Sequence, residues 1–141
     1  MKENISRDLN FNVSIAHAVH VDNASGTGIG IEDYHGATVV VYVDDWDIGT
    51  YTFKAQYADT AGTSAPSAGH ADWTDASAGD IDGSFTSITS SATDGSFQVV
   101  GFTRPARWLR VHLTESSAAT SGLDAAAFVL RGPPRVLNAM S

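Results

Sequence analysis

The chain has 141 residues, 43% of them hydrophobic, and no cysteine. This length is typical of one domain, and the lack of cysteine excludes disulfides and thiolate metal sites. No apolar run approaches the ~20 residues that a membrane-spanning helix needs. The polar N-terminus lacks the apolar stretch of a secretory signal. We therefore expect a protein that is made in a cytoplasm and has no membrane partner.

The formal net charge is −8, from 16 acidic and 8 basic residues. An acidic chain disfavours non-specific binding to DNA or RNA, which depends on neutralising phosphates, so we expect no nucleic-acid partner. The basic residues gather in the last third of the chain, which holds five arginines: Arg104, Arg107, Arg110, Arg131 and Arg135. Such arginines can meet an acidic protein partner or lie scattered on solvated strand faces.

Short alternating or β-branched runs, separated by Gly, Ser, Asp and Thr, predict short strands throughout. In chain order, the predicted strands cover residues 13–21, 29–31, 37–43, 50–57, a short piece near 73, 85–89, 96–102, 107–114 and 124–131. The run at 37–43 is the most apolar and predicts a central strand buried on both faces. The pattern indicates an all-β fold with little or no helix: an antiparallel, jelly-roll-like β-sandwich of about eight strands.

The predicted sandwich covers residues 13–132. Residues 1–12 are expected to form an N-terminal arm, and residues 133–141 a C-terminal tail, because Gly132-Pro133-Pro134 is expected to end the last strand. Residues 58–84 are rich in Ala, Gly, Ser, Thr and Asp, and Trp73 is their only large side chain. A long loop of this kind is usually functional or ordered by a partner. Trp73 is thus either a partner contact or a cap on the sandwich.

Known catalytic motifs are missing, and we expect no enzyme and no cofactor. Histidine pairs at metal-ligand spacing are also missing. His17 and His20 are three residues apart, so in a regular strand they face opposite sides and cannot bind one ion without a bulge. We expect no metal site. The acidic run Asp80-Ile81-Asp82-Gly83 begins like a calcium loop, but turn carboxylates that bond backbone amides explain it better.

Several segments together resemble a group of small virion proteins of tailed phages. They are GATVVVYV at 36–43, GTYTFKAQY at 49–57, WTD at 73–75, VVGF at 99–102, RWLRV at 107–111 and VLRGPPR at 129–135. The resemblance implies a cement or decoration protein that binds the major capsid protein on the capsid surface. It also implies a homo-oligomer, a dimer or a trimer. The candidate partner contacts are Trp73, Arg104, Arg107, Arg131 and Arg135.

Two other functions stay open. The first is another virion component, such as a head–tail adaptor, tail or fibre protein. The second is a carbohydrate-binding module, because RWLRV at 107–111 also resembles a strand of discoidin-like lectins. Three tryptophans, Trp46, Trp73 and Trp108, offer candidate surfaces for stacking on sugar rings.

Overall fold

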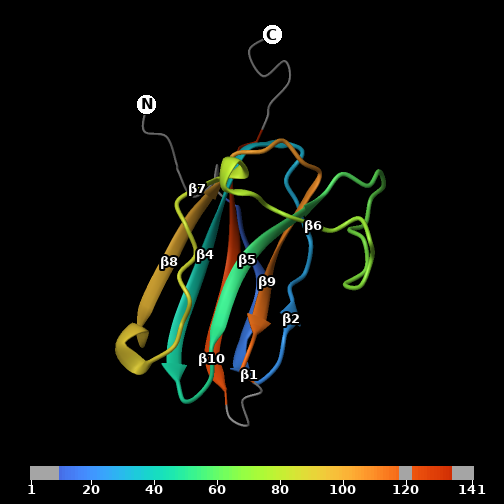
Figure 1. Cartoon of the computed structure of the whole chain (residues 1–141). Coiled ribbons are helices and arrows are strands. Elements are labelled where there is room, and N and C mark those ends of the chain that lie inside the picture. The colour runs from blue at the N-terminus through green and yellow to red at the C-terminus, as the bar shows by residue number, and fades with distance from the viewer. Residues whose placement is uncertain (1–9, 118–121, 135–141) are drawn as a thin grey trace, which may run out of the picture.

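The computed structural model describes residues 10–117 and 122–134. They form two antiparallel β-sheets that pack against each other (Figure 1). The helical content of this part of the chain is two single turns of 3₁₀-helix, η1 (Ala78–Asp80) and η2 (Ser91–Thr93). The prediction of an all-β sandwich is confirmed.

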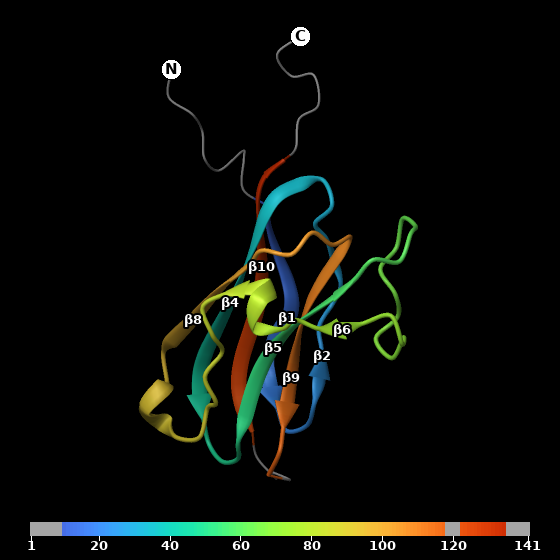
Figure 2. The same cartoon turned by 45° about the horizontal axis from the view of Figure 1, so that its top comes forward.

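Sheet A contains five strands in the spatial order β1 (Asn10–His20), β10 (Leu123–Pro134), β4 (Tyr34–Trp46), β8 (Ser96–Phe102) and β7 (Ile81–Asp82). Sheet B has the order β2 (Ala24–Ser25), β9 (Trp108–Glu115), β5 (Tyr51–Ala58) and β6 (Thr74–Asp75), and β3 (Ile29–Gly30) also pairs with β9. Figure 2 shows the same strands in a view turned by 45°.

The strand order is that of a jelly roll. When β2 and β3 count as one interrupted strand and the short β7 is left out, eight strands remain. The first, eighth, third and sixth then form sheet A, and the second, seventh, fourth and fifth form sheet B. Consecutive strands from the first to the fourth alternate between the sheets, and so do the last three. Strands arranged in this way form two Greek keys, and two Greek keys make a double-sheet jelly roll, as the sequence pattern predicted.

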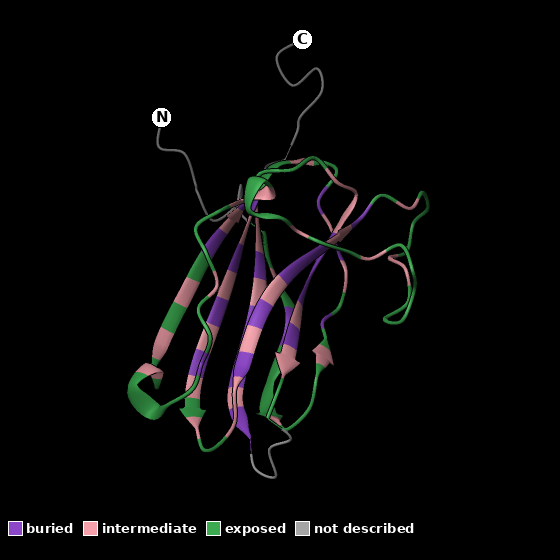
Figure 3. Cartoon of the chain, in the orientation of Figure 1, coloured by how far each residue is buried: buried purple, intermediate pink, exposed green. Residues whose placement is uncertain are grey.

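The core lies between the sheets and follows the period of two in each strand. In β4, Val39, Val41 and Val43 are fully buried, and in β5 Tyr51 and Phe53 face them from the other layer. Figure 3 shows this alternation as bands along the strands. At about 25 cal/mol per Å² of buried apolar surface, each of these large side chains contributes ~1.5–3 kcal/mol to folding.

Strand ends and one strand differ from prediction. Strand β1 begins at Asn10, inside the predicted arm, and β10 continues through Gly132 to Pro134, which pairs with Tyr34. Proline is tolerated there because a strand end needs few backbone donors. Residues 85–89 form no strand: Ile88 alone makes a bridge, to Tyr51.

The prediction that β4 is buried on both faces is wrong. β4 is central, between β10 and β8. Its alternate residues Val40 and Tyr42 are only half-buried, because a two-layer sandwich covers just one face of each sheet.

Candidate interaction surfaces

Three of the predicted arginine contacts gather at one end of the sandwich. A cleft of about 930 Å³ at this end is lined by Arg104 and Arg107, and an adjoining one of about 510 Å³ by Arg107 and Arg131. Tyr34 and Glu32 line both clefts. The fourth, Arg135, lies outside the described residues.

Arg104, Arg107 and Arg131 each already have a partner within the chain. Arg104 lies over the ring of Tyr57, 4.5 Å from its centre, and pairs with Asp80 at 3.5 Å. Arg107 pairs with Glu32 at 3.3 Å. Arg131 donates to the Gly30 carbonyl at 2.7 Å and stacks on Tyr34. The end of the sandwich is thus a balanced mixture of charges rather than a free basic patch.

Trp73 caps sheet B, one of the two placements that the sequence left open. Its half-buried ring stacks on the guanidinium of Arg110 at 4.3 Å, and its indole N–H donates to the Ser67 carbonyl at 3.0 Å. Arg110 is only 4% exposed. Its buried guanidinium has hydrogen-bond partners: Nε donates to Gln56 and Nη1 to the Ala68 carbonyl, both at 2.8 Å. Burial lowers the pKa of Arg110, although nearby Asp75 opposes this shift.

The loop that carries Trp73 therefore closes one end of the outer face of sheet B. Asp75 fixes the loop where it rejoins sheet B. Its carboxylate accepts hydrogen bonds from Gln56 at 2.7 Å and from Lys54 at 3.0 Å. The hydrogen bond from Gln56, more than the ion pair with Lys54, holds the pKa of Asp75 below its usual value. Beyond the loop, this face carries polar side chains such as Thr52 and His112.

The outer face of sheet A has the opposite character. In Figures 1 and 2, no helix, strand or loop made of described residues lies over this face. Eight of its outward side chains, on four adjacent strands, are apolar or aromatic, and we call these eight the sheet A face: Phe11, Val13, Val40, Tyr42, Phe97, Val99, Phe128 and Leu130. Phe97 and Val99 are 62% and 61% exposed, and a contiguous exposed patch of such residues is more informative than any one of them.

The register of the strands places these side chains in rows. One row runs straight across the sheet through Val13, Phe128, Val40 and Val99, each opposite the next. On one side of this row the ring of Phe11 stacks on Phe128 with 4.6 Å between centres. The result is one continuous apolar surface rather than scattered single residues.

On the other side of the row, Tyr42 and Phe97 lie opposite each other, with their ring centres 4.9 Å apart. The Tyr42 phenol donates to Asp44 at 3.2 Å. The negative charge of Asp44, more than burial of the phenol, raises the pKa of Tyr42. The apolar surface therefore ends in an acidic corner.

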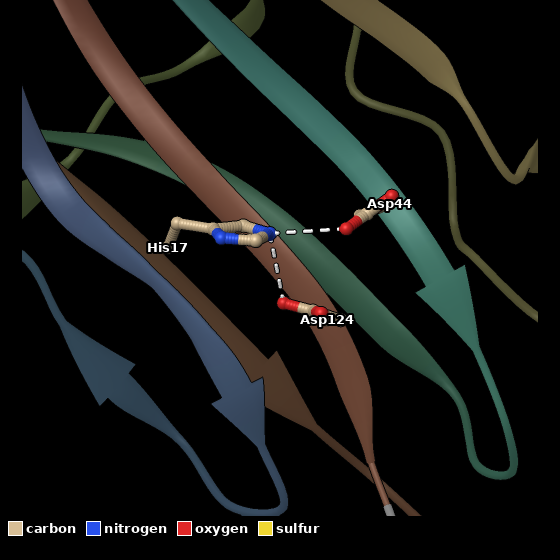
Figure 4. A group of neighbouring side chains, drawn as sticks. All are labelled: His17, Asp44 and Asp124. Carbon is tan, nitrogen blue, oxygen red and sulfur yellow. Dashed lines mark hydrogen bonds and ion pairs between the residues drawn. The ribbon is translucent and has the colours of Figure 1, made fainter.

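This corner holds a group that short-range sequence reasoning missed. His17 of β1, Asp44 of β4 and Asp124 of β10 point toward one another (Figure 4). The His17 Nε2 lies 3.2 Å from Asp44 Oδ2 and 3.0 Å from Asp124 Oδ1. The three residues are far apart in the chain, and only the strand order β1-β10-β4 brings them together.

Two irregularities in the sheet help to form the corner. The β1–β10 register shifts between Ile15 and Ala18, and the β10–β4 register shifts between Asp124 and Ala125. Extra residues at a bulge re-aim the neighbouring side chains. His17 therefore meets two carboxylates, whereas the sequence argument compared it with His20, which takes no part. A local pattern contains no signal for this group.

No protein-family model matches this sequence, and no curated protein is significantly similar to it. In residues 10–117 and 122–134, no helix has the length and apolar character needed to cross a bilayer.

Proposed function

We propose that this protein is a structural attachment module of a virion, a cement or decoration protein that binds the major capsid protein through the sheet A face. The single observation that carries the proposal is the contrast between the two sheets. The chain covers one end of sheet B with its own loop and a buried arginine, while sheet A exposes a four-strand apolar surface.

Such a surface is characteristic of protein contacts. Large, continuous apolar patches on soluble domains mark interaction sites, and aromatic residues are enriched at interface centres. The outward rings of Phe11, Phe97 and Phe128 supply those anchors. None of the eight side chains of the sheet A face is charged, so a partner can cover it without removing water from an ion.

The resemblance of the sequence to small tailed-phage virion proteins supports the finer part of the proposal, the capsid. A jelly-roll scaffold with a bare face needs no catalytic group to perform this role. Repetition of one moderate contact over many copies on a shell gives strong overall binding. Because such a protein binds the assembled shell and not dispersed subunits, it stabilises the shell by mass action.

The test is the copy number and effect of the protein in particles of the phage that encodes it. We expect stoichiometric amounts relative to the major capsid protein. Particles made without this gene should lose infectivity at lower temperature, and adding the purified protein should restore their resistance. Absence from particles, or a few copies in each, would refute the cement role.

Variants locate the contact. Val99→Lys and Phe97→Lys change exposed side chains in the sheet A face, so the fold should persist while add-back to heads falls at least tenfold. Ala71→Lys places the same charge on an exposed position of the loop over sheet B, and it should bind normally. Equal binding by all three variants would exclude the sheet A face as the contact.

The two other functions give different results in the same experiments. A head–tail adaptor, tail or fibre component would occur at one vertex or along the tail. A carbohydrate-binding module would bind a glycan array and lose binding with Trp73→Ala. Here each tryptophan indole N–H already donates to a backbone carbonyl of the chain, for Trp46 that of Gly49 and for Trp108 that of Thr60.

The proposal includes self-association as a dimer or trimer on the shell. Analytical ultracentrifugation of the free protein measures this directly. If Val99→Lys converts an oligomer to a monomer, the sheet A face joins copies of this chain instead of contacting the capsid protein.

A further inference from the structure

We propose that His17, Asp44 and Asp124 form a binding site for a divalent transition-metal ion, with Zn²⁺ as the reference ion. The three groups come from adjacent strands of sheet A and converge on one point at the surface (Figure 4). The inference concerns the acidic corner alone and holds whatever partner the sheet A face binds.

The distances suit ligands of one small ion. Zn²⁺ binds imidazole nitrogen and carboxylate oxygen at about 2.0–2.2 Å, which places neighbouring ligand atoms roughly 3.0–3.5 Å apart. The Nε2 of His17 lies 3.0 Å from Asp124 Oδ1 and 3.2 Å from Asp44 Oδ2, and the three ligand atoms all lie within 4.8 Å of one another. Small side-chain rotations can close the remaining gap between the two carboxylates.

The state of Asp124 is the second observation. Its Oδ1 is shielded from solvent and has no hydrogen-bond partner among the described residues, although His17 Nε2 is close. The ring nitrogen is aligned for a hydrogen bond with Asp44 instead. A shielded carboxylate oxygen without a hydrogen bond is costly. A cation between the three groups removes this cost, since it coordinates Asp124 Oδ1 directly.

The surroundings also order the ligands. The Tyr42 hydroxyl donates to Oδ1 of Asp44, which fixes this carboxylate and leaves Oδ2 turned toward His17. In known metal sites, hydrogen bonds to the coordinating side chains orient those side chains toward the metal. The His17 side chain is 53% exposed, so water can supply the remaining ligands.

The donor set selects the class of metal. One imidazole and two carboxylates suit Zn²⁺, Co²⁺, Ni²⁺ or Mn²⁺. Ca²⁺ requires six to eight oxygen ligands, and Mg²⁺ prefers oxygen and water. The site therefore should bind Zn²⁺ in preference to both.

The alternative is a protonated His17 that pairs with both carboxylates and needs no metal. Calorimetric titration of the full, tag-free chain with ZnCl₂ at pH 7.5 distinguishes the two. We expect one site, and we expect His17→Gln and Asp124→Asn each to weaken binding at least tenfold. A matched control is His70→Gln, because His70 lies 3.5 Å from a single carboxylate, that of Asp72; this variant should bind Zn²⁺ normally.

Thermal melting with and without Zn²⁺ gives a second readout on the same variants. The wild type and His70→Gln should melt at higher temperature with Zn²⁺, and His17→Gln should show no such rise. Failure of the wild type to bind at 100 µM Zn²⁺ would overturn the proposal, as would binding that survives His17→Gln. Equal binding of Ca²⁺ and Zn²⁺ would overturn the assignment of metal class. None of these results depends on attachment to a capsid.

Discussion

Replacing Arg110 should release the loop that covers one end of sheet B. The guanidinium makes two hydrogen bonds of 2.8 Å, to Gln56 and to the Ala68 carbonyl, and stacks on Trp73. Arg110→Met retains most of the side-chain volume and removes all three interactions. The loop beyond β5 then keeps two kinds of anchor: the contacts of Asp75 with Lys54 and Gln56, and the hydrogen bond from the Trp108 indole to the Thr60 carbonyl.

The magnitude follows from these contacts. Hydrogen bonds to a charged group are worth about 1.5–3 kcal/mol each, and a partly buried cation–π contact adds about 1 kcal/mol. Desolvation of the buried guanidinium, visible in its lowered pKa, offsets part of this sum. We expect a net loss of about 3 kcal/mol, which lowers the melting temperature by about 10 °C for a domain of this size.

Circular dichroism melts and limited proteolysis between residues 59 and 73 measure the two effects. A double-mutant cycle with Trp73→Ala should give a coupling energy of about 1 kcal/mol. Arg104→Met is the control, because Arg104 also stacks on an aromatic ring but its side chain is 43% exposed, so its loss should cost less than 1 kcal/mol. If Arg110→Met melts within 2 °C of the wild type, the loop is not held as described.

Three further variants test other parts of the fold. Gly26→Ala would place a Cβ 2.6 Å from the Val111 carbonyl oxygen and should cost more than 2 kcal/mol in urea unfolding, whereas Gly69→Ala meets no atom within 4 Å and should be nearly neutral. Burial, followed by neighbouring cations, lowers the pKa of His112, so the folded state resists its protonation. The contribution of His112 to folding stability should therefore be complete above pH 6.5 and should be lost progressively as the pH falls below this value. The variant His112→Asn should flatten this decline in thermal melts between pH 7.5 and 5. Arg131→Met removes a 2.7 Å hydrogen bond to sheet B and should cost about 1–2 kcal/mol by the same unfolding assay.

Local sequence pattern was sufficient for the fold class and for several of the strands. The alternation in residues 50–57 predicts which side chains of β5 enter the core, and Tyr51, Phe53 and Ala55 are all buried. Strand β8 has the predicted bounds, Ser96–Phe102. The period of two is a property of the backbone, and turn residues mark where it stops. These signals are local, so one sequence is enough to find them.

Predicting the character of the two outer faces requires information that no local sequence pattern contains. The apolar run at 37–43 predicts a strand buried on both sides, yet a run of Val and Tyr also results when one side meets an external partner. Sequence cannot distinguish a neighbouring layer of the same chain from another protein. Asp44 comes close to His17 only because their strands, β4 and β1, both lie next to β10 in sheet A.

The outer faces of the two sheets differ in how far the chain itself covers them, and this difference bears on the proposed attachment. Covering part of sheet B uses a long loop rich in small residues, with one tryptophan and one buried arginine to hold it. Sheet A carries no such cover within the described residues, and full burial of exposed side chains such as Phe97 and Val99 by a neighbour yields about 1–2 kcal/mol each. The four exposed side chains of the sheet A face, Phe11, Val13, Phe97 and Val99, give a gross gain of roughly 4–8 kcal/mol, much of which association itself removes through lost translation and rotation. A modest affinity for one site would suffice for the proposed attachment to a repeated lattice, because copies on adjacent sites support one another. An enzyme inhibitor or a soluble partner of low abundance would need a tighter single contact than this face provides.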